Sequence, residues 1–363
     1  MKQFANDKII ILLGAGASCD AGILNSAQMI LKIEEKIKDQ SWAQYKSLYQ
    51  YIKSAHYQRR IFLGSNPGSI SFNIEDLVGL LNIIIDIAKK EIDSYIFVGN
   101  WEKDLTPFII DQQNNRSVSL FKEDLIKELQ TAWLSPDGWI KKSSYYTKLI
   151  DFKNSLDGYP LKIFSLNYDL CVEQNLKDEK VEIGFDEQNE WNFRRYDYSD
   201  TNKDIGFYLY KIHGSIDWEQ TGRDKIIKKG TGIKTDNLAI IFGLTNKLQS
   251  YDPYLFYSYE FREHCLDAEL LVCSGYSFKD THINDFIKFG FKDKPQKRLI
   301  VNVMGTDNEK TNIKKGISSE LEINEKQICI YHEKASDFFN VNLKLESFAS
   351  LFDEEEENLP NDF

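Results

Sequence analysis

A glycine-rich turn follows the first apolar run of this sequence. The run IIILL (residues 9–13) continues directly into GAGAS (14–18), and Gly22 follows soon after. Glycine allows a ligand or another backbone to approach closely, and the amides at the start of a following helix can bind phosphate. A pyrophosphate site is one interpretation, and a tight strand-to-helix turn without a ligand is the other.

The spacing of this turn argues against two familiar nucleotide sites. A dehydrogenase fingerprint GxGxxG needs a third glycine where the sequence has Cys19. Its ribose-binding acid would fall at Glu34 or Glu35, inside a predicted helix rather than after a second strand. The turn also lacks the GK[ST] ending of a P-loop, so ATP hydrolysis is unsupported.

Polar residues follow several later apolar runs. In open α/β sheets, ligands bind beyond the carboxyl ends of the strands, so these positions are candidates for chemistry. Asparagine offers both a donor and an acceptor, and histidine titrates near neutral pH. Each residue also has an ordinary explanation, because Asn and Asp form turns and a strand-end histidine is often a structural residue. The candidates, in chain order, are Asn167, Asp169, His213, Gly275, Ser277 and Asn302.

The elements that would position these residues predict an α/β fold with a Rossmann-like, mostly parallel sheet. Short β-branched runs bounded by turns are typical of buried strands. They lie at 8–13, 161–169, 207–215, 237–243, 268–277 and 297–305.

Helical patterns fill the stretch 41–155, which we expect to be a large helical insertion. One helix is expected to begin at Asn73 as its N-cap. In SLFKEDLIKELQTAWL (119–134) the residues expected to face inward are Leu120, Leu125, Leu129 and Trp133. Asp20 and Asp280 are each expected to cap a helix start.

Composition narrows the class of protein. The 363 residues carry a net charge of −11, with 42% hydrophobic and 28% charged residues, which is typical of a soluble globular protein. The acidic balance argues against direct nucleic-acid binding or an anionic-membrane surface. The five cysteines lack any CxxC pair, so neither a zinc ribbon nor a disulfide scaffold is expected. No run approaches the roughly 20 apolar residues of a membrane span, and the N-terminus lacks a signal-peptide pattern, so a cytoplasmic protein is expected.

In their joint order these segments resemble the sirtuin signature. The order is GAGAS, Asn-x-Asp at 167–169, His213-Gly214, Gly-x-Ser at 275–277, and a strand bearing Asn302. More narrowly, the chain is similar to the bacterial antiphage branch of sirtuin-fold NAD hydrolases, as found in Thoeris-type effectors and partners of HerA-like ATPases. The resemblance covers residues 8–24 and 160–305.

The chain also departs from the sirtuins that deacylate proteins. Those carry a four-cysteine zinc module, and no such cysteine pattern exists here. Their glycine loop continues into Pro-Asp-Phe-Arg, where this chain has Ile-Leu-Asn-Ser (23–26), and Leu166 stands where they have Gln before the Asn-x-Asp. These departures count against deacylation of acetyl-lysine and do not contradict the use of NAD.

The resemblance implies roles for individual residues. Asn167 and His213 would be catalytic: the amide would hold a ribose hydroxyl and the incoming water, and the imidazole would take a proton. The glycine loop would cradle the pyrophosphate, and Asp169 would accept hydrogen bonds from the nicotinamide carboxamide. No metal is expected. The full set implied to bind NAD is Gly14, Ala15, Gly16, Ser18, Asp169, Gly275, Ser277 and Asn302.

The resemblance implies an NAD⁺ glycohydrolase that yields nicotinamide and ADP-ribose and acts as an antiphage, abortive-infection effector. An NAD-dependent deacylase or ADP-ribosyltransferase using the same two residues is one alternative. A module that binds NAD or ADP-ribose without turnover is another.

Such an enzyme would kill its host without control, so we expect gating by homo-oligomerisation or by a HerA-like ATPase partner. The helical insertion could serve this purpose, or could simply cap the fold. The expected domains are a sirtuin-like NAD-binding domain of 1–40 and 156–345, the insertion at 41–155, and an acidic tail at 346–363.

Overall fold

The chain is built around a seven-stranded sheet in which every pair of neighbouring strands is parallel. The computed structural model describes residues 4–90, 108, 112–198, 204–222, 225–241, 251–305 and 307–356. Its strand order, β10-β9-β8-β1-β2-β4-β3, confirms the expected α/β class with a mostly parallel sheet. The strands are β1 (Ile9–Leu13), β2 (Leu161–Ser165), β3 (Val181–Glu182), β4 (Phe207–Lys211), β8 (Leu270–Ser274), β9 (Arg298–Val303) and β10 (Ile328–His332).

Helices cover both faces of this sheet, which explains why β1 is apolar at every position. Ile9 and Ile11 belong to one buried cluster, while Ile10 and Leu12 belong to another, because successive strand residues point to opposite faces. The second cluster packs against α9 (Tyr254–Asp267), α10 (Thr281–Phe291) and α11 (Asp307–Leu321). The first includes side chains of α7 (Lys148–Asn154) and α13 (Leu345–Glu356).

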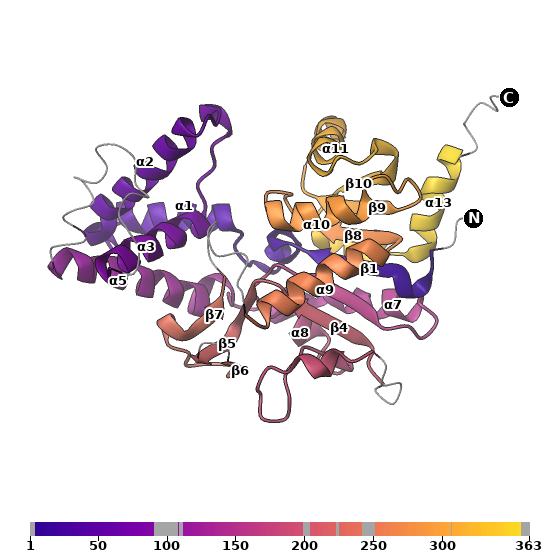
Figure 1. The fold of residues 1–363 in the computed structure, drawn as a ribbon, viewed down its shortest axis with the longest axis horizontal. Helices are drawn as coiled ribbons and strands as arrows, with labels where there is room; N and C mark the ends of the chain where they lie inside the picture. The colour runs from indigo at the N-terminus through magenta and orange to yellow at the C-terminus, as the bar shows by residue number, and fades with distance from the viewer. Residues whose placement is uncertain are drawn as a thin grey trace.

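Within the described residues, a group of helices, the helical lobe, lies to one side of the sheet (Figure 1). They are α1 (Ser26–Lys38), α2 (Lys46–Phe62), α3 (Ile74–Ala88) and α5 (Gln112–Glu128). Asn73 caps α3 as expected, since its side-chain oxygen accepts from the Asp76 amide at 3.0 Å. The short helices are α6 (Trp139–Lys142), α8 (Cys171–Asn175) and α12 (Ala335–Asp337).

The expectation that Leu120 faces inward is wrong, because its side chain is 39% exposed. The buried stripe of α5 runs through Val118, Phe121 and Leu125, at spacings of three and four residues. Leu120 falls beside that stripe, whereas Leu129 and Trp133 are buried as expected.

Two expected strands belong partly to a second, three-stranded sheet. The run 207–215 is broken after β4, and the chain re-enters extended structure in β5 (Gly214–Gly222). The strand expected at 237–243 is β7 (Leu238–Ile240), which pairs antiparallel with β5, as does β6 (Lys225–Lys228); positions 242–243 lie outside the described residues. The break occurs at Gly214, where φ is +83° and a Cβ would lie 2.1 Å from the Ala239 carbonyl oxygen.

The C-terminal part differs from the expected acidic tail. β10 was not expected from the sequence, yet it completes one edge of the large sheet. The helix α13 then returns to the core, with Phe348 fully buried. The proposed tail at 346–363 therefore begins inside a packed helix, and 357–363 lie outside the described residues.

Candidate functional site

The site lies where the order in which the chain adds strands to the sheet reverses. From β1 the chain builds outward through β2 and β4, and from β8 it builds the opposite way through β9 and β10. Because β1 and β8 are neighbours, the turns that follow them face each other at the switch point, where open α/β sheets bind ligands. The glycine turn at 14–18 and the Gly-x-Ser turn at 275–277 are therefore brought together.

The glycines of these turns allow two backbones to touch. The amide of Gly14 donates to the Ser274 carbonyl, and that of Gly16 to the Gly275 carbonyl, both at 2.9 Å. A Cβ on Gly14 would lie 2.6 Å from the Gly275 oxygen, and one on Gly275 would lie 1.9 Å from the Ala17 nitrogen. Close approach of two turns thus explains these glycines without a ligand. The loop continues as a short 3-10 helix over Ala15–Ala21, in which Ala15 is exposed.

Asn167 lies beyond β2 and carries an unused buried acceptor. Its Nδ2 donates to the Gly14 carbonyl at 3.0 Å and contacts the Ser18 hydroxyl at 3.4 Å. A carbonyl oxygen can only accept, so this contact fixes which end of the amide is nitrogen. The Oδ1 atom is buried and has no hydrogen-bond partner among the described residues. A buried acceptor without a partner is costly, so Asn167 is placed to accept from a donor that the described residues do not supply.

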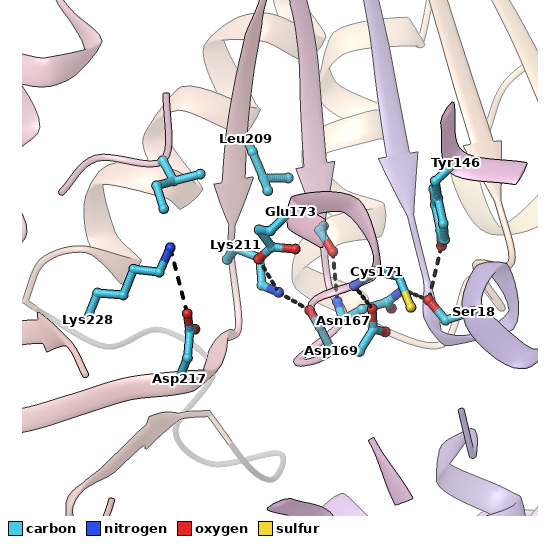
Figure 2. A network of polar contacts seen from close by, with 12 residues as sticks. Ser18, Tyr146, Asn167, Asp169, Cys171, Glu173, Leu209, Lys211, Asp217 and Lys228 are labelled. Carbon is cyan, nitrogen blue, oxygen red and sulfur yellow. Dashed lines mark hydrogen bonds and ion pairs between the residues drawn. The ribbon is translucent and has the colours of Figure 1, made fainter. Parts of the chain in front are cut away.

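Ser18 is held inside the protein rather than turned toward solvent. Its hydroxyl lies 3.0 Å from the Tyr146 hydroxyl, and the side chain is fully buried (Figure 2). The neighbouring Tyr145 donates to the Ala17 carbonyl at 2.6 Å. Burial raises the pKa of both tyrosines, so their hydroxyl groups stay neutral where they contact the glycine loop. Ser18 therefore supports Asn167 and the loop.

Asp169 shapes the turn after β2. One of its oxygens accepts from the Cys171 amide at 2.9 Å, and its own backbone carbonyl accepts from the Lys211 ammonium. The carboxylate is buried next to Asn167 (Figure 2). Burial raises the pKa of Cys171, and also that of Cys19 in the glycine loop, so both remain thiols at neutral pH and are poor nucleophiles.

His213 occupies the position beyond β4 that Asn167 occupies beyond β2. Ser165 and Lys211 are register partners on these neighbouring strands, and each candidate follows two residues later. The Nε2 atom of His213 lies 3.3 Å from Oδ2 of Asp280, and both side chains are only 7% exposed. The strands that precede His213 and Asp280 are separated by β1 and β2, so this contact spans the ends of those strands.

Asp280 is the site residue that the sequence reasoning missed. Its role as helix cap is confirmed, since Oδ1 accepts from the His282 amide at 3.2 Å at the start of α10. Its pairing with His213 joins positions 67 apart in the chain. In the sequence, the one feature near Asp280 that pointed to the site was the Gly-x-Ser turn just before it. Asp20, by contrast, does not cap the helix after the glycine loop, because Asn25 does; its carboxylate accepts from the Ser336 amide instead.

Ser277 and Asn302 are placed differently from the other candidates. Ser277 follows Gly275 on the turn and is exposed. Asn302 is 1% exposed, and both ends of its amide are used: Oδ1 accepts from the Ser274 hydroxyl at 2.9 Å and Nδ2 donates to the Glu333 carbonyl at 3.0 Å. Asn302 therefore ties the ends of β8 and β9 together.

A buried ion pair lies beneath the Asn-x-Asp turn. The Lys211 ammonium is 3.0 Å from Glu173, and the side chain of Lys211 is 2% exposed (Figure 2). Burial alone would lower the pKa of Lys211, but Glu173, Asp169 and Asp217 together raise it. The lysine is therefore charged at neutral pH and anchors the turn that carries Asn167.

The described residues form neither a metal-binding cluster nor a helix able to span a membrane. Within the described ranges, no group of three or more His, Cys, Asp or Glu side chains is arranged to hold a metal ion. Of the helices described, none combines the length and hydrophobicity that crossing a membrane requires.

Comparisons with known proteins show what parts of the chain are similar to. A search of curated proteins finds no match. Among solved structures, the chain is similar to a Sir2 homologue in complex with NAD, at 9% identity and a TM-score of 0.41, over 96% of this chain and 90% of that chain. A mutant Sir2 homologue in complex with 2′-O-acetyl-ADP-ribose matches at 10% identity and a TM-score of 0.39, over 98% and 94% of the two chains.

One family model matches the part of the chain that includes β2, β4, β8 and β9 and the turns after them. Residues 161–331 match the family model of the SIR2-like domain. This range includes Asn167, His213 and Asp280, and the glycine turn at 14–18 lies before it. Residues 161–331 are therefore similar to the SIR2-like domain.

Proposed function

We propose that this protein is an NAD⁺ glycohydrolase, in which Asn167 and His213 act on NAD. The observation that carries the proposal is the buried, unpartnered Oδ1 of Asn167 at the switch point of the sheet. A hydroxyl group, from a ribose or from water, is the donor that this oxygen lacks. The SIR2-like domain match supports a nucleotide that carries a ribose next to its leaving group.

Cleavage of NAD to nicotinamide and ADP-ribose needs little covalent chemistry from the protein. Nicotinamide leaves NAD as a neutral molecule while positive charge develops at the anomeric carbon of the ribose, so positioning and electrostatics carry most of the catalysis. Asn167 would orient the ribose hydroxyl and the water, and His213 would accept the proton that the water gives up. Asp169, buried beside Asn167, would accept hydrogen bonds from the nicotinamide amide.

The glycine loop would receive the pyrophosphate in this proposal. Ala15 is exposed and Gly16 is half-buried, so their segment is open to a ligand, whereas Ser18 faces inward. Gly275 and Ser277 form the facing turn, and the exposed hydroxyl of Ser277 is available to the adenosine half. Asn302 would act indirectly, by holding the strand ends on which that turn rests.

The test is release of nicotinamide and ADP-ribose from NAD by the purified chain, followed by chromatography. Asn167→Ala and His213→Ala are each expected to lower the rate about 100-fold or more, because they remove the orienting amide and the proton acceptor. His264→Ala is the matched control, since His264 pairs with Glu260 on α9 rather than at the switch point. Each variant is first checked for an unchanged fold by circular dichroism and thermal unfolding.

The outcomes separate the alternatives. Normal NAD loss by Asn167→Ala would contradict the assignment. Transfer of ADP-ribose or removal of an acyl group, detected on an added protein acceptor, would indicate a transferase or deacylase that uses the same residues. Binding of NAD without release would indicate a binding module, and absence of binding would leave the glycine turn with its structural role alone.

We propose an antiphage, abortive-infection role for this activity, gated by homo-oligomerisation or by a HerA-like ATPase. The support is the resemblance of the motifs and the exposed apolar side chains of Ile61, Phe62 and Leu63 at the end of the helical lobe. Bacteria that express the chain are expected to lose NAD after phage infection, and the Asn167→Ala strain is expected to keep it. Equal NAD levels in the two infected strains would contradict this role.

A further inference from the structure

Asp280 uses its two carboxylate oxygens for two different tasks. Oδ1 accepts from the His282 amide and caps α10, while Oδ2 faces Nε2 of His213 at 3.3 Å. The cap fixes the carboxylate at the helix start, and burial of both side chains excludes most of the water that would compete for the imidazole. The second contact is not needed to cap the helix.

We propose that Asp280 is a positioning residue that sets the tautomer of His213, an inference that rests on the proposed function. A carboxylate only accepts hydrogen bonds, so the Nε2 atom facing it carries the proton of the neutral imidazole. The Nδ1 atom then keeps its lone pair. It makes no hydrogen bond with any residue in the described ranges, so this lone pair is available to a substrate.

This arrangement matches the proton balance of the hydrolysis. The water oxygen forms a bond to the anomeric carbon as the bond to nicotinamide breaks, and that electron pair returns to the nicotinamide ring nitrogen. The water proton passes to Nδ1 of His213, directly or through a ribose hydroxyl. The resulting imidazolium carries a positive charge, which the Asp280 carboxylate stabilises.

Substitution by asparagine separates the two tasks of Asp280. Asparagine is also a good N-cap, so Asp280→Asn keeps the bond to the His282 amide. Its NH₂ group would face Nε2 of His213 and donate to it, which moves the imidazole proton to Nδ1 and blocks the base. Asp280→Ala removes both tasks, and it is expected to lower stability by about 1 kcal/mol through the lost cap.

We expect kcat for nicotinamide release to fall about 100-fold or more in Asp280→Asn, with KM changed by less than about threefold, because the base is lost and the binding groups remain. The thermal midpoint of Asp280→Asn should match that of the wild type, and that of Asp280→Ala should be lower. If Asp280 only caps the helix, Asp280→Asn keeps full activity, and that result would overturn the inference.

A second measurement does not depend on turnover. Nitrogen-15 NMR of the histidine side chains in the full chain reports which imidazole nitrogen carries the proton, and His213→Gln assigns the signal among the five histidines. The wild type is expected to show the Nε2–H form and Asp280→Asn the Nδ1–H form. The same tautomer in both proteins would overturn the inference. The expected tautomers without nicotinamide release would overturn the proposed function and leave the positioning by Asp280 standing.

Discussion

At the scale of single residues, Gly275 is the described glycine at which a Cβ would come closest to another atom. Its φ is +65°, and a Cβ there would meet the Ala17 nitrogen at 1.9 Å, on the neighbouring turn. Both turns of the switch point therefore depend on this one position. Two separate effects oppose a side chain at Gly275. The positive φ strains any L-residue, and the short distance would force the glycine loop to move.

Gly275→Ala is therefore expected to lower the free energy of unfolding by about 2 kcal/mol or more, through the clash and the strain together. Denaturant unfolding measures this change. Gly230→Ala is the matched control, since Gly230 has a φ of +85° but nothing within 4 Å of its Cβ position. It carries the strain without the clash, so equal losses in the two variants would contradict the explanation.

Some of the site was predictable residue by residue. Asn167 and His213 were found because each follows an apolar run, and neighbouring parallel strands end at one edge of the sheet. The partner of His213 was not found, because Asp280 pairs with it across the ends of β1 and β2. Asn302 is a polar residue at a strand end, as a ligand-binding residue would be. Both ends of its amide, however, already make hydrogen bonds, with the Ser274 hydroxyl and the Glu333 carbonyl. A sequence does not show whether a polar group is already satisfied.

At the scale of elements, the ion pair of Lys211 and Glu173 joins the end of β4 to α8. It also fixes the turn between β2 and α8, since the ammonium donates to the Asp169 carbonyl. Burial raises the pKa of Glu173 despite the nearby lysine, which shows how strongly this position penalises charge. Removing one partner would leave the other buried without the opposite charge that offsets its burial.

Lys211→Met is expected to lower the free energy of unfolding by about 3–5 kcal/mol, the usual cost of an uncompensated buried charge. The double variant Lys211→Met/Glu173→Leu should lose less than Lys211→Met alone, because no charge is left behind. Both are measured by denaturant unfolding. Lys180→Met, which breaks an exposed pair with Asp204, is the control and should leave stability nearly unchanged. A double variant less stable than Lys211→Met would contradict this account.

The elements themselves were predictable to different degrees. β1 and β8 are short, apolar and bounded by glycine, which is why their positions were found. The stretch 207–215 was expected to form one strand, and the left-handed backbone of Gly214 is what shows that the chain changes sheets there. β10 was missed because Tyr331 and His332 give it a partly polar pattern at an edge of the sheet.

At the scale of the whole molecule, one face of the sheet is packed with tyrosines. Tyr196 stacks on Tyr210 with ring centroids 4.7 Å apart, and Tyr210 stacks on Phe164 at 4.4 Å. The Tyr196 hydroxyl donates to the Leu209 carbonyl at 2.9 Å, while Trp191 donates to the Tyr257 hydroxyl at 3.0 Å. These contacts join β2, β4 and α9, so the hydroxyl groups of this cluster belong to the core.

Burial raises the pKa of Tyr196, Tyr210 and Tyr257, which makes the fold sensitive to alkali. In the unfolded chain these phenols ionise near pH 10, while in the folded chain they stay protonated. Their contribution to stability is therefore complete below about pH 10 and is lost as the pH rises above it, because the unfolded state then binds fewer protons. We expect the free energy of unfolding to fall steeply above about pH 10, with tyrosinate absorbance appearing only as the chain unfolds.

Tyr196→Phe isolates one member of this cluster. It removes one ionisable group and the bond to the Leu209 carbonyl, so the variant should be less stable at neutral pH and lose less stability between neutral pH and about pH 11. Tyr159→Phe is the control, because Tyr159 is 49% exposed, and its profile should follow the wild type. If Tyr196→Phe lost as much stability at alkaline pH as the wild type, the buried phenols would not be the cause of that loss. Lys297 would not explain such a slope, because burial lowers its pKa to about 8, so between about pH 8 and 10.5 its own contribution to stability rises with pH and opposes the fall. That opposite sign is why a steep alkaline loss points to the tyrosine face of the sheet.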